Sequence, residues 1–210
     1  MMSLFFEVEV KPERTEQYLT LAASLKPRLD EMGGCLFLDR FRSLSRQNVL
    51  LSYQIWQDEG AMTAWRVDAQ HHKVQTLGRE KVFSDYRLRI GQVIHEARRG
   101  GDVWQPERLT PYNDPARRKP TYVLVTESGS AKVPLRPDWP SEAFASVYRE
   151  GRFAHLIELP DNQSGGVPFS DRLLADAATE YVRIVEVIRD YGMHDRLEAP
   201  QYYPPVGRAV

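Results

Sequence analysis

The sequence predicts an α+β protein built on the ferredoxin-like order β-α-β-β-α-β. Three observations carry this prediction. Short segments alternate apolar and polar residues as strands do, segments between them repeat apolar residues every three or four positions as helices do, and turn-forming residues separate the two kinds. Such a unit leaves one face of its sheet bare, so we expect a second layer, commonly a second copy, to cover it.

The first three segments are a strand, a helix and a strand. Residues 4–10 have the alternation of a strand, and a helix begins at residues 11–14. Gly33 and Gly34 end this helix, because glycine adopts positive φ at little cost. Residues 35–42 form the second strand. The apolar face of the helix carries Tyr18, Leu21, Leu25 and Leu29.

The last three segments of the unit are again a strand, a helix and a strand. Residues 49–56 form the first of them. The carboxylate of Asp58 can cap the helix that follows, and that helix is interrupted near Asp68. Residues 82–95 form the strand that completes the unit.

The second half of the chain has the sequence of a degenerate copy of the first. Residues 144–161 align without gaps on residues 41–58, and Phe, Ser, Arg and Asp coincide at four positions. Residues 180–188 repeat the pattern of residues 85–94 with one gap. Two such units in one chain can pack sheet to sheet as a pseudo-dimer.

The copy lacks a first helix, because residues 129–142 contain three prolines. Residues 169–178 are expected to form its second helix. The alternative is that the first unit forms a homodimer and the second half is an appendage. The predicted domains are a ferredoxin-like unit at residues 1–99, a linker at residues 100–120, and a second unit with a C-terminal arm at residues 121–210.

Composition and charge exclude several classes of protein. The net charge of −1 provides no electrostatic attraction to nucleic acid or to an anionic membrane. No apolar run is long enough to span a membrane, and the N-terminus lacks the features of a signal peptide, so we expect a cytoplasmic protein. Cys35 is the only cysteine, which excludes an internal disulfide and a cysteine-based zinc site.

Three stretches of the first half resemble the antibiotic biosynthesis monooxygenase family of dimeric α+β barrels. They are FFEVEVKPERTEQYL, LLSYQIWQDEGAMTAW and HHKVQTLGREKVFSDYRLRIGQV, within residues 4–97. The resemblance implies a pocket between the sheet and its helices, a homodimer or pseudo-dimer, and no cofactor. It implies an oxygenase that uses O2 on a small aromatic, phenolic or quinol-like molecule. Other members of the family degrade haem or have no assigned activity.

The resemblance carries over residue by residue. Trp65 matches the pocket tryptophan that the family has on its second helix. Haem-degrading members have an iron-ligating His and an Asn where this chain has Gln75 and Glu7, which argues against haem degradation. Members that act on polyketides have a Tyr where this chain has His71.

His71 and His72 are the candidate catalytic residues. A neutral imidazole can take a proton from a phenol at physiological pH, which makes the phenol easier to oxidise. Adjacent residues on a helix point about 100° apart, so both cannot face one pocket. The alternative for either residue is a histidine on the helix surface. A metal site is not expected, because the pair lacks metal-ligand spacing.

Five residues are expected to contact the substrate: Trp65, Gln75, Tyr86, Arg87 and Arg89. Trp65 either stacks on a planar substrate or packs in the core. Arg87 and Arg89 lie on one face of a strand. If this face is buried, the two cations need an anionic partner, either an oxyanion of the substrate or a carboxylate such as Glu7. If it faces solvent or an interface, they form ion pairs there.

The leading functional prediction is therefore a cofactor-independent monooxygenase. The alternative from another class is a ligand-binding or assembly protein of the same fold that lacks the reactive residues. Gln75 and Glu7 stand where an oxygenase branch has His and Asn, which favours this alternative slightly.

Overall fold

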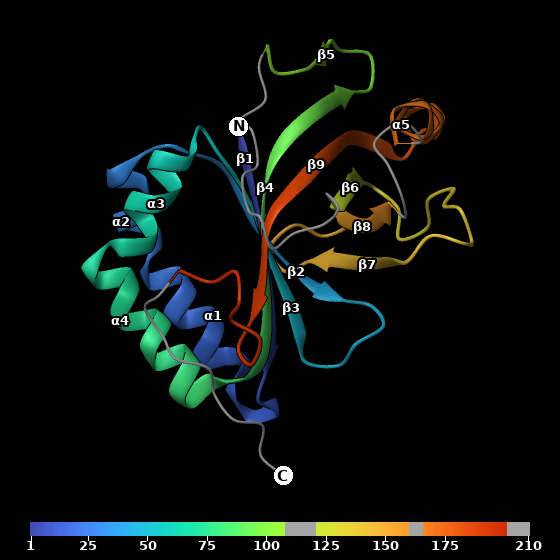
Figure 1. Ribbon diagram of the computed structural model, residues 1–210. Coiled ribbons are helices and arrows are strands. Elements are labelled where there is room, and N and C mark those ends of the chain that lie inside the picture. The colour runs from blue at the N-terminus through green and yellow to red at the C-terminus, as the bar shows by residue number, and fades with distance from the viewer. Residues whose placement is uncertain (108–120, 160–165, 201–210) are drawn as a thin grey trace. The chain divides into compact units, whose positions relative to one another are not determined.

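The computed structural model describes residues 1–107, 121–159 and 166–200, and the chain divides into two compact units (Figure 1). The first unit comprises Met1–Arg40, Arg46–Ile90 and Arg189–Val210, and the second comprises Phe41–Ser45 and Gly91–Ile188. Helices and antiparallel strands alternate as the ferredoxin-like prediction requires, so the α+β fold class is confirmed. Within the described residues, no helix is long and apolar enough to cross a membrane.

The first unit has the predicted order of elements. They are β1 (Met2–Val10), the 3-10 turn η1 (Pro12–Arg14), α1 (Thr15–Ser24), α2 (Lys26–Met32), β2 (Cys35–Ser43), β3 (Val49–Trp56), α3 (Glu59–Val67), α4 (Ala69–Leu77), the π-helical turn η2 (Gly78–Val82) and β4 (Phe83–Arg98). The strands lie in the order β4-β1-β3-β2, with β1 antiparallel to β3 and Phe5 opposite Tyr53. Figure 1 shows the helices on one face of these strands.

Each predicted helix of this unit is two helices in the structure. Pro27 lies in the first turn of α2, and its ring excludes the helical position of the carbonyl four residues earlier, so α1 ends at Ser24. The second break was predicted. Asp68 has extended backbone, and its carboxylate accepts hydrogen bonds from the amides of Gln70 and His71, both at 3.0 Å, which starts α4.

The predicted helix ends are also confirmed. The Asp58 carboxylate accepts a 2.8 Å hydrogen bond from the Ala61 amide at the start of α3. Gly33 and Gly34 follow α2 with φ of 72° and 77°. A Cβ on Gly34 would lie 2.5 Å from the Cβ of Ala61, so this position also needs glycine to let α3 approach.

The second unit has an analogous arrangement of strands. Its elements are the ends of β2 and β4, β5 (Val103–Trp104), β6 (Thr121–Ser128), β7 (Ser141–Ser146), β8 (Phe153–Leu159), α5 (Gly166–Ala175) and most of β9 (Thr179–Gly192). In the order β7-β8-β6-β9, strand β6 lies between β8 and β9, just as β1 lies between β3 and β4 in the first unit. A tandem repeat requires this order, but the repeat itself stays a prediction.

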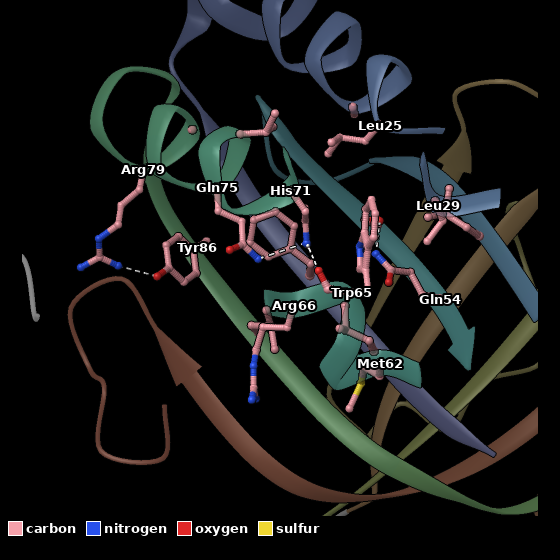
Figure 2. Close-up of a pocket in the computed structure, with 18 of the residues that line it drawn as sticks. Leu25, Leu29, Gln54, Met62, Trp65, Arg66, His71, Gln75, Arg79 and Tyr86 are labelled. Carbon is pink, nitrogen blue, oxygen red and sulfur yellow. Dashed lines mark hydrogen bonds between the residues drawn. The ribbon is translucent and has the colours of Figure 1, made fainter. Parts of the chain in front are cut away.

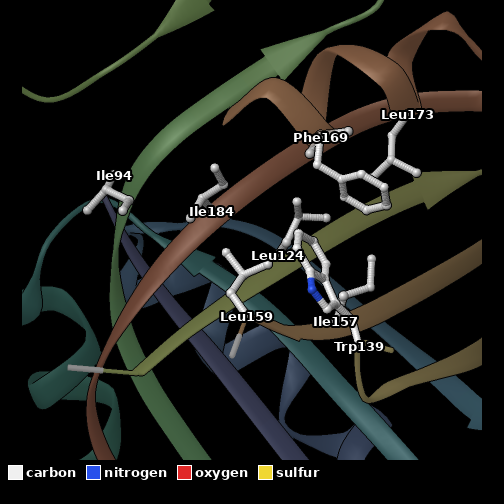
Figure 3. Packing of buried hydrophobic residues seen from close by; sticks show 9 residues of the cluster. Ile94, Leu124, Trp139, Ile157, Leu159, Phe169, Leu173 and Ile184 are labelled. Atoms are coloured by element: carbon white, nitrogen blue, oxygen red, sulfur yellow. The ribbon is translucent and has the colours of Figure 1, made fainter. Parts of the chain in front are cut away.

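The core of the second unit packs α5 against its strands (Figure 3). Leu124, Ile157 and Ile184 are fully buried, and Trp139 meets Phe169 edge to face with ring centroids 4.8 Å apart. The helix α5 begins and ends three residues earlier than predicted. Most of the predicted linker, residues 108–120, and the last ten residues of the predicted arm lie outside the described residues.

Candidate functional site

A pocket of about 200 Å³ lies in the first unit between its sheet and its helices (Figure 2). Its volume somewhat exceeds the roughly 150 Å³ of a cavity that admits a benzene ring. Most of the lining is apolar, which suits a small and largely apolar guest. The apolar lining residues include Leu4, Leu21, Ala22, Leu25, Leu29, Leu38, Met62, Val74, Phe83, Leu88 and Ile90.

Trp65 and His71 form a stacked pair on the wall of this pocket. Their ring centroids are 4.2 Å apart and their planes differ by 15°. A continuous helix would place the two positions on different faces, because six residues turn the chain by about 600°. The break at Asp68 changes this direction and brings the imidazole back over the indole. Thus Trp65 packs against His71 and also lines the pocket.

The hydrogen bond of His71 determines which ring nitrogen is free to accept a proton. Nδ1 lies 2.8 Å from the backbone carbonyl oxygen of Trp65. A carbonyl oxygen can only accept, so Nδ1 carries the hydrogen and Nε2 of the neutral ring is the acceptor. Burial lowers the pKa of His71 and outweighs the opposing effects of the Trp65 carbonyl and Asp68. The imidazole is therefore neutral at physiological pH.

The polar end of the pocket is built around Tyr86. Its hydroxyl oxygen accepts hydrogen bonds from Arg79, at 2.5 Å, and from Arg196, at 2.8 Å. Gln75 lines the pocket beside His71, with its amide nitrogen 3.4 Å from the imidazole Nδ1. Figure 2 shows Gln75, Tyr86 and Arg79 beside the stacked pair.

The structure brings four of the seven predicted site residues to this pocket and keeps three away. Trp65, His71, Gln75 and Tyr86 line it, whereas His72, Arg87 and Arg89 do not. As expected for neighbouring residues on a helix, only one of the two histidines lines the pocket, and it is His71.

Arg89 is buried and pairs with a carboxylate, which was one of its predicted alternatives. Its guanidinium lies 2.5 Å from Glu7, and the two side chains are 4% and 8% exposed. Arg46 binds the other carboxylate oxygen of Glu7 at 2.5 Å. Burial raises the pKa of Glu7, but the attraction of Arg89 and Arg46 outweighs it, so this pKa lies below its usual value. This network holds β1 to β4.

Arg87 is not among the pocket-lining residues and pairs with Asp190 at 2.7 Å. Asp190 lies near the end of β9. This strand end and the residues that follow it place Tyr191, Arg196 and Pro200 in the pocket lining. Arg87 therefore ties the end of β9 to β4 within the first unit.

Sequence reasoning missed the two arginines that bind Tyr86. Arg79 follows Gln75 by four residues, the spacing of neighbours on one helix face, and that spacing was an available signal. Arg196 had no such signal, because it lies 110 residues from Tyr86.

The charges that line the pocket all have one sign. Five lining residues are cationic: Lys26, Arg40, Arg66, Arg79 and Arg196. Within the part of the chain that the structure describes, the lining contains no Asp or Glu. The pocket therefore suits a molecule that combines an apolar body with an oxygen-rich or anionic end.

Comparisons with known proteins identify relatives of the whole chain and of its first unit. The sequence profile of the antibiotic biosynthesis monooxygenase family matches residues 1–77. A protein of the fungus Pyricularia oryzae, named jasmonate monooxygenase ABM, is 32% identical over 225 residues, which cover 98% of this chain and 99% of that protein.

The solved structures that resemble this chain have lower sequence identities. A conserved protein of Methanosarcina mazei is 20% identical, with a TM-score of 0.40, over 42% of this chain and 88% of its own. An antibiotic biosynthesis monooxygenase is 17% identical, with a TM-score of 0.40, over 44% of this chain and 97% of its own. A candidate monooxygenase of Fusobacterium nucleatum is 9% identical, with a TM-score of 0.44, over 90% of this chain and 93% of its own.

Proposed function

This chain belongs to the antibiotic biosynthesis monooxygenase family, and from that premise we propose that it is a cofactor-independent monooxygenase acting on a small ring-containing molecule in the pocket of the first unit. The observation that carries the proposal is the stacked pair of Trp65 and His71. The indole presents an aromatic surface to a planar guest. The neutral imidazole supplies a proton acceptor beside that guest.

The substrate class that this pair fits best is a phenol or quinol. His71 Nε2 takes the hydroxyl proton, and the resulting phenolate is more easily oxidised by O2 than the phenol. For a phenol, one oxygen atom of O2 becomes a new ring carbonyl and the other becomes water. The ring C–H hydrogen and the hydroxyl hydrogen both end in that water. Four electrons pass from the phenol to O2, so no other reductant takes part.

The name of the Pyricularia oryzae relative supports oxidation of a small organic molecule and adds a second candidate substrate, jasmonate. Jasmonate has a small apolar body and a carboxylate, and the pocket of this chain has an apolar interior and five cations. Jasmonate therefore belongs in any substrate panel alongside the phenols and quinols.

The alternative function is ligand binding without oxidation. Glu7 favours it in one respect, because the carboxylate is bound in the network with Arg89 rather than exposed to the pocket. On this alternative, the molecule in the pocket would be bound and released unchanged.

Oxygen uptake tests the proposal. The purified chain is incubated with hydroxyquinols, naphthols and jasmonate, in air and under nitrogen, without added metal or cofactor. We expect one member of the panel to be consumed in air only, and Trp65→Ala to lower the rate because it removes the stacking surface. Binding without O2 uptake would favour the non-catalytic alternative. Equal rates for Trp65→Ala and wild type would refute the assigned pocket.

A further inference from the structure

A chain of hydrogen bonds runs along strand β3 on the sheet side of the pocket. The indole nitrogen of Trp56 donates to Gln54 Oε1 at 2.9 Å, and Gln54 Nε2 donates to Ser52 Oγ at 3.1 Å. Ser52 and Gln54 line the pocket, where Figure 2 shows Gln54, and Trp56 is fully buried. Trp56 therefore supports the two lining residues from within the core.

The direction of each hydrogen bond in this chain follows from the groups that form it. An indole N–H can only donate, so the oxygen of the Gln54 amide faces Trp56 and the nitrogen faces Ser52. The Ser52 oxygen accepts, and its hydrogen remains available to donate. Neither that hydrogen nor the second amide hydrogen of Gln54 has an acceptor among the described residues. The chain thus ends in hydrogen-bond donors at the pocket.

Arg40, on the neighbouring strand β2, adds donors to this side of the pocket. Its Nε is buried and has no hydrogen-bond partner among the residues that the structure describes. A guanidinium has five N–H donors and no acceptor. The polar lining that β2 and β3 contribute, Arg40, Ser52 and Gln54, therefore offers mainly donors to a ligand.

The proton acceptor of the site is on the helical side. His71 belongs to α4, and the bond of its Nδ1 to the Trp65 carbonyl leaves Nε2 as the acceptor. The pocket lies between the sheet and the helices, so a phenol inside it has this acceptor on one side and the donors of β2 and β3 on the other. Loss of the hydroxyl proton leaves a negative charge on the ligand, and hydrogen-bond donors stabilise that charge.

The apolar lining of the pocket makes such stabilisation necessary. Burial in apolar surroundings disfavours the charged form of an acid, so it raises the pKa of a bound phenol. An imidazole alone would then take the proton less readily. Donors that are fixed before the ligand enters offset this effect, because they need no rearrangement as the charge forms. Ser52 and Gln54, held by strand β3 and by Trp56, meet this condition.

We propose that Arg40, Ser52 and Gln54 form an oxyanion site that binds the ionised oxygen of a phenolic substrate on the sheet side of the pocket. This inference rests on the proposed function and identifies the residues that select the charge state of the bound molecule. Ser52 and Gln54 donate from neutral groups, and Arg40 donates from a charged one. The three residues bind and orient the ligand, and His71 takes its proton.

Ionisation of a bound chromophoric phenol tests the oxyanion site. para-Nitrophenol, whose phenolate absorbs at longer wavelength than the phenol, is titrated over pH under nitrogen with wild type, Arg40→Met, Ser52→Ala and Gln54→Glu. para-Nitroanisole, which cannot ionise, measures binding of the ring alone. Gln54→Glu keeps the acceptor for Trp56 and replaces the amide donor with an acceptor. Arg42→Met is the matched control, because Arg42 is an exposed residue of β2 that does not line the pocket.

We expect wild type to bind the phenolate roughly 10- to 100-fold more tightly than the phenol, so the pKa of bound para-nitrophenol should fall by about 1–2 pH units. Arg40→Met and Ser52→Ala should each remove part of that preference, Gln54→Glu should abolish it, and Arg42→Met should retain it. Thermal unfolding identifies any variant that fails to fold. Arg40→Met replaces a half-buried side chain with one that is also long and flexible, so it keeps the test decisive.

Four results separate the oxyanion site from the proposed oxidation. No binding of para-nitrophenol, or an unchanged pKa of the bound phenol in wild type, would overturn the inference. A fall in Arg40→Met and Ser52→Ala equal to that in wild type would overturn it too, because His71 would then account for the ionisation. Phenolate binding without oxygen uptake would support the oxyanion site while refuting the oxidation. Oxygen uptake equally fast in wild type and both variants would support the oxidation while overturning the site.

Discussion

Replacing His71 with phenylalanine separates the two roles that the structure gives this residue. Phenylalanine keeps an aromatic ring against Trp65, where the native centroids are 4.2 Å apart. It removes the proton acceptor Nε2 and the 2.8 Å hydrogen bond from Nδ1 to the Trp65 carbonyl. The variant therefore tests proton transfer with the pocket wall largely retained.

Losing the proton acceptor and losing the hydrogen bond should have effects of different sizes. Loss of a positioned general base lowers kcat/KM by about 10²- to 10⁴-fold. Loss of one net hydrogen bond costs about 0.5–1.5 kcal/mol of folding free energy. For a chain of this length that cost lowers Tm by a few degrees, at roughly 2–4 °C per kcal/mol. His71→Ala also removes the stacking contact, which adds about 0.5–1.5 kcal/mol.

The assay compares kcat/KM and Tm for wild type, His71→Phe, His71→Ala and His72→Phe. We expect both His71 variants to lose activity, His71→Ala to be the less stable, and His72→Phe to keep its activity because His72 does not line the pocket. Full activity in His71→Phe would refute the assignment of the base. A larger loss in His72→Phe than in His71→Phe would assign the base to the other histidine.

The pH dependence of wild type provides a second check on the same residue. Burial lowers the pKa of His71, so kcat/KM should fall only as pH drops below the ordinary imidazole range. The lowered pKa of His71 also makes the stability of the fold depend on pH. The unfolded chain gains this proton first on acidification, so stability is full above the ordinary pKa and is lost as pH falls toward the lowered value. A midpoint above about 7 would contradict the burial that the structure describes.

Three further predictions concern stability and are measured by urea unfolding. Glu7→Gln removes the charge that pairs with buried Arg89 and should cost about 3–5 kcal/mol of folding free energy. Because the pKa of Glu7 is lowered, this stabilisation is present above the usual carboxyl pKa and is lost as pH falls through the lowered pKa. A cost under 1 kcal/mol at pH 7 would contradict the ion pair. Gly91→Ala places a Cβ 2.3 Å from the Glu186 carbonyl oxygen and should cost about 1–3 kcal/mol, so a neutral result would show that the strands do not approach this closely. Asp58→Ala removes a helix cap and should cost about 1 kcal/mol, whereas Asp58→Asn, which keeps an acceptor, should cost less.

Local chemistry made most of the first unit predictable. Alternation and helical spacing located its strands and helices, and Asp58, Asp68 and Gly33 located helix ends, because capping and positive φ are properties of single residues. The break between α1 and α2 was missed although Pro27 was visible in the sequence. The boundaries of α5 shifted by three residues, since helix ends depend on packing as well as on the sequence pattern.

The site was less predictable than the fold, because its geometry depends on contacts between distant residues. The stacked pair required the new chain direction after Asp68, which changes where His71 points relative to Trp65. The burial of Arg89 beside Glu7 was one of the predicted possibilities, since strand alternation does not say which face is covered. Arg196 was beyond local reasoning, because only tertiary structure brings it to Tyr86.

Oxygen-isotope labelling tests the central claim most directly, namely that this chain inserts oxygen from O2 into a molecule held beside Trp65 and His71. The substrate identified by oxygen uptake is oxidised under ¹⁸O2 by wild type and by His71→Phe, without added cofactor. We predict one ¹⁸O atom in each product molecule, with one O2 consumed, and a rate for His71→Phe about 10²- to 10⁴-fold lower. An unlabelled product, or an equally fast labelled reaction in His71→Phe, would contradict the claim.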